Sequence, residues 1–232
     1  MSALVERAKN VKYTPPPPKY HPDIEKEFRD YLDLLMDPEK TGLVNVDITN
    51  VFTEEGAMLA PKEGYKIVPN VNKLVEYFRA HKMPIIWIQW GGRLDGSNFG
   101  IFYKYWKKHP LITEKMSDPS HHGGQLHPEL HFKQEDIYVR KPKYNAWWGS
   151  DLEAVIRNFA LESLVFTGIM TNVCVQLALC EAHHRDFNTI IAVDCTDTPL
   201  PSKEDTLSLM ELYWARALTA DEVIVELEAL KP

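Results

Sequence analysis

From about residue 40 onward, short apolar runs alternate with amphipathic stretches. The apolar runs cover residues 41–48, 84–90, 135–141, 162–168 and 188–195. Between and after them, apolar residues recur every three or four positions over residues 70–82, 151–161, 173–187 and 203–217. Short continuous runs indicate buried strands, and the longer spacing indicates helices. The alternation predicts an α/β fold, a mostly parallel central sheet flanked by helices on both faces in three layers.

Two parts of the chain give weaker patterns. Residues 99–109 are compatible with a short helix, and residues 220–230 with a final helix or with a strand followed by a helix. Residues 1–40 form an N-terminal arm, in which TPPPPKYHP (14–22) must be extended and residues 23–37 have helical spacing. The arm can lie on its own domain or a neighbouring subunit, or serve as a ligand for a proline-reading module. The main domain is expected over residues 41–232.

Composition narrows the functional classes. The 232 residues carry a net charge of −7, so the chain lacks the overall excess of basic residues that is typical of proteins that bind nucleic acid or an anionic membrane. No stretch approaches the roughly 20 apolar residues that span a bilayer, and the N-terminus lacks an apolar signal core. Three cysteines are too few for a disulfide framework. We expect a reduced, cytoplasmic protein with a small-molecule partner.

Three polar residues lie at or just beyond the ends of predicted strands. Asp47 and Lys141 each end an apolar run, and Cys174 follows another at the first turn of a predicted helix. In open parallel sheets, ligands bind beyond the carboxyl ends of the strands. We therefore expect these three side chains to share one edge of the sheet.

Together these residue types can perform nucleophilic catalysis. A helix N-terminus and the cation of Lys141 would lower the pKa of the Cys174 thiol. Asp47 can accept the thiol proton and pass it to a leaving amine. The loop before the cysteine, residues 169–172, supplies backbone N–H groups that can stabilise an oxyanion. This scheme needs no histidine.

Three motifs carry a resemblance to a known family. VDITNVFTEEG contains Asp47, VRKPKYNAWWGSDL contains Lys141, and GIMTNVCV contains Cys174. In this order and spacing they resemble the cysteine hydrolases of the isochorismatase-like superfamily, from about residue 40 to 230. The resemblance implies that Asp47, Lys141 and Cys174 form a catalytic triad. It also implies a cis peptide between Ile169 and Met170, and an oxyanion hole formed by the N–H groups of Met170 and Cys174.

The residues around Lys141 and Cys174 most resemble those of amidohydrolases that act on ureidoacrylate, biuret or N-carbamoyl amino acids. The resemblance implies cleavage of a C–N bond in a small ureido or carbamoyl amide through a thioester, with release of ammonia or an amine. It also implies a homodimer or homotetramer. The metal-binding Asp-x-His of nicotinamidases has no counterpart in WIQWGGRLDG, and we expect no metal or other cofactor. Thr49 and Val51 replace the Gln and Asp common in the first motif, which leaves the substrate open.

Candidate substrate contacts flank the triad. We expect Asn50 to make a polar contact and the aromatic residues Phe52, Tyr144 and Trp148 to form an apolar wall against a flat amide. A substrate carboxylate would need a cation, and Arg93 and Lys143 are nearest in the motifs. Arg216 is instead expected on a helix surface.

Other interpretations remain open. The four histidines of SHHGGQLHPELH (120–131) suggest a metal site, but they lack the spacing of a helical metal pair. Cys180 and Cys195 are expected to be structural, because free cysteine packs as a small hydrophobic residue. A binding protein that has lost turnover, or a hydrolase of nitriles or simple aliphatic amides, would also fit the fold.

Overall fold

The computed structural model describes residues 36–57, 59–93, 95–106, 118, 120–200 and 203–230. The proline-rich segment and the helix expected over residues 23–37 lie almost wholly outside these residues. The described chain begins with a 3₁₀ turn, Pro38–Lys40, and enters the first strand at Thr41.

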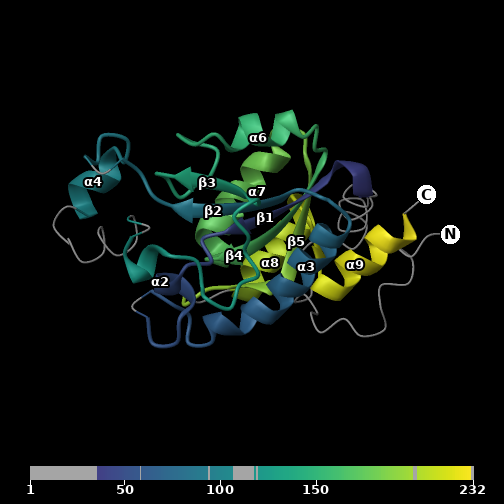
Figure 1. Ribbon diagram of the computed structural model, residues 1–232, viewed down its shortest axis with the longest axis horizontal. Coiled ribbons are helices and arrows are strands. Elements are labelled where there is room, and N and C mark those ends of the chain that lie inside the picture. The colour runs from purple at the N-terminus through teal and green to yellow at the C-terminus, as the bar shows by residue number, and fades with distance from the viewer. Residues whose placement is uncertain are drawn as a thin grey trace.

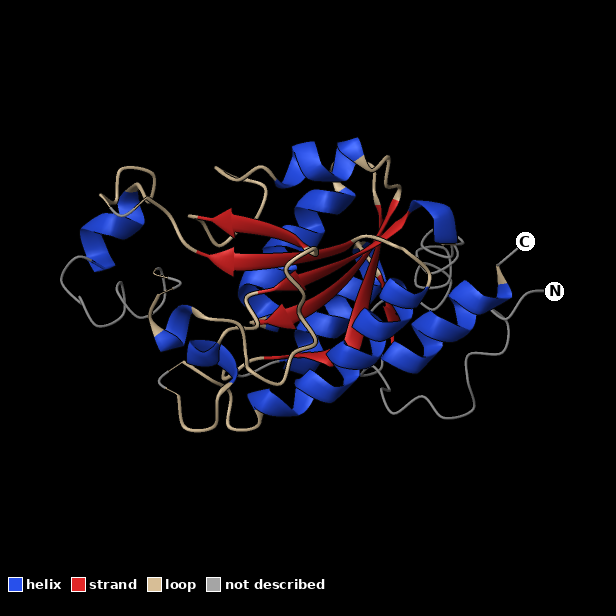
Figure 2. Ribbon diagram, viewed as in Figure 1, coloured by secondary structure: helices blue, strands red, loops and turns tan. Residues whose placement is uncertain are grey.

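Six strands form a single sheet in which every pair of neighbours is parallel (Figure 2). They are β1 (Thr41–Val46), β2 (Ile85–Trp90), β3 (Ile137–Lys141), β4 (Ser163–Ile169), β5 (Asn188–Asp197) and β6 (Arg216–Leu218). Their order is β3-β2-β1-β4-β5-β6, so successive strands are added in one direction up to β3 and in the other from β4. The predicted fold class is confirmed, and the strand order reverses between β1 and β4. Ligand sites in such sheets lie at this reversal.

Helices cover both faces of the sheet (Figure 1). One face is covered by α2 (Asn50–Thr53), α3 (Val68–Ala80) and α9 (Ala220–Ala229), and the other by α6 (Leu152–Asn158), α7 (Gln176–His183) and α8 (Lys203–Tyr213). The short helix α4 (Ile101–Trp106) lies beyond the ends of β2 and β3, and 3₁₀ turns occupy Gly64–Ile67 and His122–Gly124. The short α2 was not predicted, because four residues are too few to show a period. The final segment is a helix, the first of the two alternatives expected for it.

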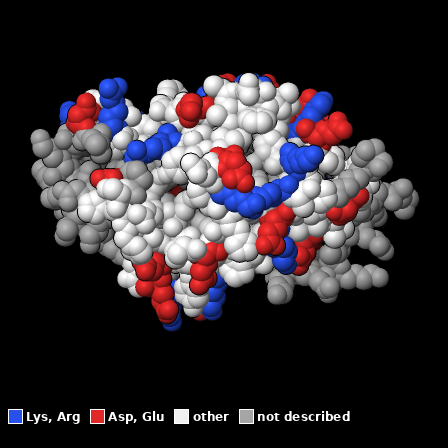
Figure 3. Space-filling model, in the orientation of Figure 1, with Lys and Arg blue, Asp and Glu red and all other residues white. Residues whose placement is uncertain are grey.

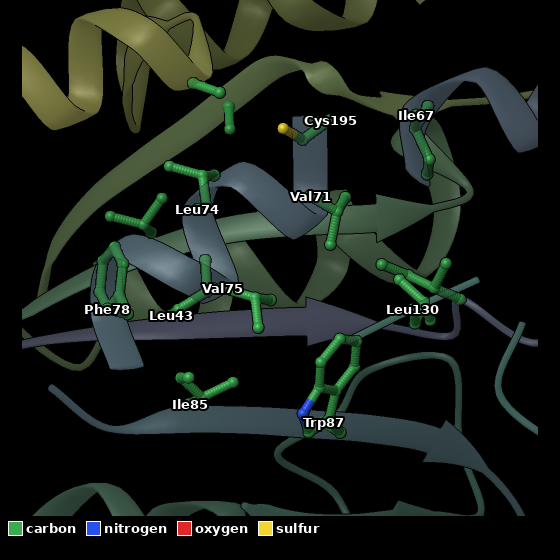
Figure 4. Close-up of a cluster of buried hydrophobic side chains, with 14 of the residues drawn as sticks. Leu43, Ile67, Val71, Leu74, Val75, Phe78, Ile85, Trp87, Leu130 and Cys195 are labelled. Carbon is green, nitrogen blue, oxygen red and sulfur yellow. The ribbon is translucent and has the colours of Figure 1, made fainter. Parts of the chain in front are cut away.

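Each face of the sheet has its own buried core. Leu43 and Trp87 pack under α3 with Val71, Leu74 and other side chains in Figure 4. The neighbouring strand residues, such as Val44 and Ile86, point into the opposite core under α6, α7 and α8. This alternation is what a strand buried on both faces requires. Cys195 lies in the first core, consistent with the structural role expected for it (Figure 4).

The structure corrects the predicted end of one helix and the predicted surface position of Arg216. The helix expected over residues 203–217 ends at Tyr213, and Arg216 belongs to the edge strand β6. Arg216 is buried, not on a helix surface, and pairs through both guanidinium nitrogens with the carboxylate of Glu226 in α9. A three-residue strand that begins with a charged residue has no apolar pattern of its own.

The surface carries both signs of charge. Basic and acidic side chains lie beside one another over the face drawn in Figure 3, as in the exposed pair of Lys73 and Asp221 at 2.7 Å. Among the helices of the described residues, none is both long and apolar enough to cross a membrane.

Gly168 lies against the backbone of β1. Its φ of +113° is rarely adopted by residues with a side chain, and a Cβ atom there would lie 1.9 Å from the carbonyl oxygen of Val46. Because that oxygen belongs to the backbone of β1, no rotamer change can relieve the clash. The first residue of GIMTNVCV is therefore fixed as glycine by the contact between the two strands that carry Asp47 and Cys174.

We predict that Gly168→Ala destabilises the fold by more than about 4 kcal/mol, because it forces two strands apart as well as straining φ. Gly56 is the matched control, since its φ is +76° but nothing lies within 4 Å of a Cβ built there. Gly56→Ala should cost about 1–2 kcal/mol. Urea denaturation measures both, and equal losses would contradict the assignment of the clash.

Candidate active site

Three side chains from distant parts of the chain meet at the carboxyl edge of the sheet. The Nζ atom of Lys141 lies 2.7 Å from Oδ2 of Asp47 and 3.4 Å from Sγ of Cys174. The side chains of Asp47 and Lys141 have no exposed surface, and Cys174 is buried. The structure thus brings together the three residues that the sequence placed at strand ends.

The Asp47–Lys141 pair spans the end of β2, because β1 and β3 are not neighbours. The parallel register sets Val46 beside Ile88 and Trp90 beside Lys141. Asp47 continues the ladder by donating its N–H to the carbonyl of Ile88 at 2.8 Å, and its φ of +53° then turns the chain out of the sheet. The indole of Trp90 lies under the ammonium of Lys141, at 4.8 Å from Nζ to the ring centroid. The ion pair therefore rests on an aromatic ring at the strand end.

The surroundings of Lys141 favour its charged form. Burial alone would lower the pKa of Lys141, but the nearby Asp47 carboxylate and Cys174 sulfur raise it, and the net shift is upward. Lys141 also donates to the carbonyl of Lys143 at 3.2 Å. Both oxygens of Asp47 are buried, and apart from the ion pair of Oδ2 with Lys141 neither accepts a hydrogen bond from the described residues.

The pKa of the Cys174 thiol differs from the sequence expectation. Burial raises the pKa of Cys174 to about 12, with the charge of Lys141 opposing that shift and the carboxylate of Asp47 adding to it. The expected lowering of the pKa is therefore wrong for this state of the protein. The sequence showed neither the burial of the thiol nor that Lys141 also pairs with a carboxylate. Cys174 lies in a π-type turn, Thr171–Val175, ahead of the first residue of α7. A thiol with a raised pKa needs a proton acceptor before it can act as a nucleophile.

The backbone before the cysteine has the geometry expected from the resemblance at one point. The peptide between Ile169 and Met170 is cis. The carbonyl of Met170 then accepts hydrogen bonds from the N–H groups of Val173 and Val175, at 3.1 and 3.2 Å. The N–H groups of Met170 and Cys174 belong to the same compact turn. Their role as an oxyanion hole stays a prediction.

Sequence reasoning missed two threonines behind this turn. The Thr196 hydroxyl donates a hydrogen bond to the carbonyl of Gly168, and the Thr198 hydroxyl donates to the side chain of Asn172, each at 2.8 Å. Both lie at the end of the fifth apolar run, where the polar run TDTP could have indicated the same edge of the sheet.

The histidine-rich segment, residues 120–131, also lies beside the site, which sequence reasoning did not anticipate. Its residue Leu126 forms an antiparallel bridge with Thr49, and His127 donates its N–H to the carbonyl of Ile48 at 3.1 Å. His122 contacts Glu54 in an exposed pair, at 2.7 Å between Nε2 and Oε2. No group of three metal-ligating side chains occurs within the described ranges. The segment holds the turn that follows Asp47.

Asn50 is buried with one polar atom unused. Its Nδ2 donates to the carbonyl of His122 at 2.8 Å. Because a carbonyl can only accept, the amide nitrogen must face His122, which fixes the position of Oδ1 on the other side. That oxygen is buried and accepts no hydrogen bond from the described chain. Buried acceptors of this kind are uncommon and call for a partner.

The candidate aromatic residues divide into buried and exposed. Phe52 is buried, and Tyr144 packs against Phe102 and Trp90 with ring centroids 4.5 and 5.2 Å apart. Burial raises the pKa of the Tyr144 hydroxyl. Trp148 is 61% exposed, so it is not part of this buried wall. Its neighbour Trp147 is buried instead and donates Nε1–H to the carbonyl of Ala178 at 2.8 Å.

The two candidate cations, Lys143 and Arg93, lie in different surroundings. Lys143 donates to the carbonyl of Phe99 at 2.6 Å and so lies against the aromatic group next to Lys141. Arg93 is exposed, with Asp95 at 4.0 Å. Lys143 is the better placed of the two beside the triad.

Fold and site together define a class: an α/β protein with a buried Asp–Lys pair and a thiol at the rim of a parallel sheet. The isochorismatase domain matches residues 41–222, and the chain belongs to this family. It is an isochorismatase-like hydrolase, as the three motifs predicted.

Individual relatives agree with this assignment. Ureidoacrylate amidohydrolase RutB of Klebsiella pneumoniae subsp. pneumoniae is 27% identical over 191 residues, which cover 75% of this chain and 80% of the relative. A cysteine hydrolase from Pseudomonas syringae pv. phaseolicola has the same fold, with a TM-score of 0.77 at 22% identity over 85% of this chain and 97% of that one. N-carbamoylsarcosine amidase from Thermoplasma acidophilum gives a TM-score of 0.64 at 22% identity, over 78% and 97% of the two chains.

The buried ion pair generates a prediction about stability. Lys141→Met leaves the Asp47 carboxylate buried without its partner and should cost about 3–5 kcal/mol of unfolding free energy. Adding Asp47→Asn removes the orphaned charge, and the double variant should be more stable than Lys141→Met alone. Urea denaturation tests the order. A double variant less stable than the single one would show that the charges are not coupled.

The raised pKa of the Cys174 thiol generates a prediction about labelling. Only the thiolate reacts, and its fraction grows about tenfold per pH unit below the pKa. The rate of iodoacetamide alkylation at Cys174, followed by peptide mass spectrometry, should therefore keep rising from pH 7 to 10. Cys174→Ala gives the background from the other two thiols. A plateau below pH 8.5 would mean that the resting sulfur is already ionised.

Proposed function

We propose that the protein is a cysteine-dependent amidohydrolase that cleaves a C–N bond of a small ureido or carbamoyl amide. The supporting observation is the contact of one buried ammonium, that of Lys141, with both the carboxylate of Asp47 and the sulfur of Cys174. The names of the relatives, a ureidoacrylate amidohydrolase and an N-carbamoylsarcosine amidase, point to the same substrate class.

The first half of the reaction forms a covalent intermediate. Asp47 removes the thiol proton as the sulfur of Cys174 attacks the planar carbonyl carbon. A carbon–sulfur bond forms, and the carbonyl electron pair moves onto oxygen. The N–H groups of Met170 and Cys174 stabilise that oxyanion. Lys141 remains charged throughout and offsets the negative charge that passes from sulfur to oxygen.

The second half returns the enzyme to its resting state. The carbon–nitrogen bond breaks as Asp47 gives its proton to the leaving nitrogen, and ammonia or an amine departs. The product on Cys174 is a thioester, or an S-carbamoyl group when the attacked carbonyl belongs to a ureido group. Water, deprotonated by Asp47, attacks this carbonyl, and the sulfur leaves and recovers the proton. Acid, amine and free thiol result.

The unused acceptor on Asn50 supports a substrate that carries N–H groups. A ureido or carbamoyl nitrogen can donate to Oδ1, which is buried and accepts no hydrogen bond from the described residues. The rings of Phe52 and Tyr144 offer apolar contacts to the flat amide. Trp148, on the surface, stays a prediction as a fourth contact.

The expected setting is also part of the proposal. We expect the protein to act as a cytoplasmic homodimer or homotetramer, without a metal or other cofactor. The reaction steps above use only side chains and backbone groups of one chain. Size-exclusion chromatography coupled to light scattering gives the oligomeric state directly.

The substrate proposal is tested by ammonia release from ureidoacrylate, biuret, N-carbamoyl amino acids and simple aliphatic amides. We predict turnover of a ureido or carbamoyl compound, and loss of at least about 10⁴-fold in Cys174→Ala and Cys174→Ser with the fold retained. Circular dichroism checks the fold. Undiminished turnover by either variant would exclude the mechanism. Binding without turnover in the wild type would favour a binding protein, and turnover of the aliphatic amides alone a different substrate class.

A further inference from the structure

Two buried hydroxyls connect the cysteine turn to β5, and their direction can be deduced. Thr196 Oγ1 lies 2.8 Å from the carbonyl oxygen of Gly168 and 2.8 Å from Oγ1 of Thr171. A carbonyl oxygen can only accept, so Thr196 uses its single proton there. Thr171 must then be the donor to Thr196. Both threonines are fully buried, so water does not compete for these bonds.

A second connection runs parallel to the first, one residue further along the turn. The N–H of Leu200 donates to Oγ1 of Thr198 at 3.2 Å, and Thr198 lies 2.8 Å from Oδ1 of Asn172. Because the backbone N–H already supplies a proton to Thr198, the threonine proton is free to bond Asn172. The chain of donors thus runs from the backbone after β5 to the turn that carries Cys174.

These connections lie just beyond an irregularity in the pairing of β4 with β5. β4 advances two residues from Phe166 to Gly168, while β5 advances five from Ile191 to Thr196. The regular backbone ladder between the two strands is interrupted at this point. The ladder resumes with Gly168 beside Thr196 and Ile169 beside Asp197. There the Thr196 hydroxyl adds a side-chain hydrogen bond to the carbonyl of Gly168, immediately before the cis peptide and the π-type turn.

We propose that Thr196 is a positioning residue for the oxyanion step, with Thr198 supporting the same turn. This inference rests on the proposed function, since it concerns the N–H groups of Met170 and Cys174. Thr196 holds both Gly168 and Thr171, the residues on either side of Ile169–Met170, and so fixes the direction of those N–H groups. Its hydroxyl bonds Gly168 and Thr171, so it acts on the reaction through these residues. Small misplacements of such donors cost large factors in rate.

Two reactions of the same sulfur separate this role from a general structural one. Iodoacetamide alkylates Cys174 by direct displacement of iodide, with no oxyanion. p-Nitrophenyl acetate acetylates it: a carbon–sulfur bond forms, an oxyanion develops, the carbon–oxygen bond breaks, and p-nitrophenolate leaves while Asp47 takes the thiol proton. The ratio of the two rates reports the oxyanion donors and is independent of the natural substrate. A burst that is absent in Cys174→Ala assigns the acetylation to this thiol.

Removing the hydroxyl should change one reaction and spare the other. We expect Thr196→Val to slow the acetylation burst by about 10- to 100-fold, with alkylation changed by less than about threefold. Thr196→Ser keeps the hydroxyl and should restore the burst to within about threefold of the wild type. With ureidoacrylate, kcat should fall by the same factor as the burst, while KM changes by less than about threefold.

Thr189 provides the matched control. It lies on the same strand, is also buried, and donates its hydroxyl to a backbone carbonyl, that of Trp214, near the opposite end of β5. Thr189→Val should leave the rate ratio unchanged. A ratio in Thr196→Val equal to that in Thr189→Val, or no recovery in Thr196→Ser, would overturn the proposal.

The test remains decisive if Thr196→Val does not fold, as judged by circular dichroism. Thr198→Val and Thr198→Ser then replace it, with the same expected direction, and an unchanged ratio in Thr198→Val overturns the proposal. Failure of the proposed function looks different, because Cys174→Ala would then keep turnover whatever the threonine variants do.

Discussion

Opposite charges on Asp47 and Lys141 lie in contact inside the protein, although their strands are not neighbours in the sheet. Moving each charge out of water costs several kcal/mol, which only close pairing offsets. The pair therefore requires β1, β2 and β3 in register, with the indole of Trp90 beneath the lysine. A hydrophobic pair would fill the same space with less risk to folding. The presence of charge at this rim is thus best explained by chemistry performed there.

The sulfur completes the arrangement because β4 approaches β1 without a side chain between them. Gly168 permits that approach, and the turn after it sets Cys174 against the same ammonium. A protonated thiol and a buried carboxylate, both in contact with one ammonium, form a resting state suited to proton transfer on attack. In the proposed mechanism, the lysine compensates charge before and after that transfer. The proposed nucleophile, proton acceptor and cation thus meet at one buried ammonium.

Much of the fold and the three site residues could be predicted from the sequence, for identifiable reasons. Continuous apolar runs mark β1, β2, β4 and β5, and polar residues at strand ends converge in any parallel sheet. The edge strand β6 was not predicted, because its buried Arg216 is neutralised by Glu226, a partner that no local pattern shows. The predicted shift of the Cys174 pKa had the wrong direction, because the shift depends on burial and on how Lys141 is shared between Asp47 and Cys174. Thr196 and His127 were missed because their contacts are set by tertiary structure alone.

The proposed mechanism is tested most directly by trapping the covalent intermediate on Cys174. The protein is mixed with ureidoacrylate, quenched in acid within milliseconds to seconds, and digested for peptide mass spectrometry. The mechanism predicts a carbamoyl adduct on the peptide containing Cys174, and no adduct in Asp47→Asn, where the thiol proton has no acceptor. Turnover without any adduct on Cys174, or an adduct that forms equally fast in Asp47→Asn, would contradict it.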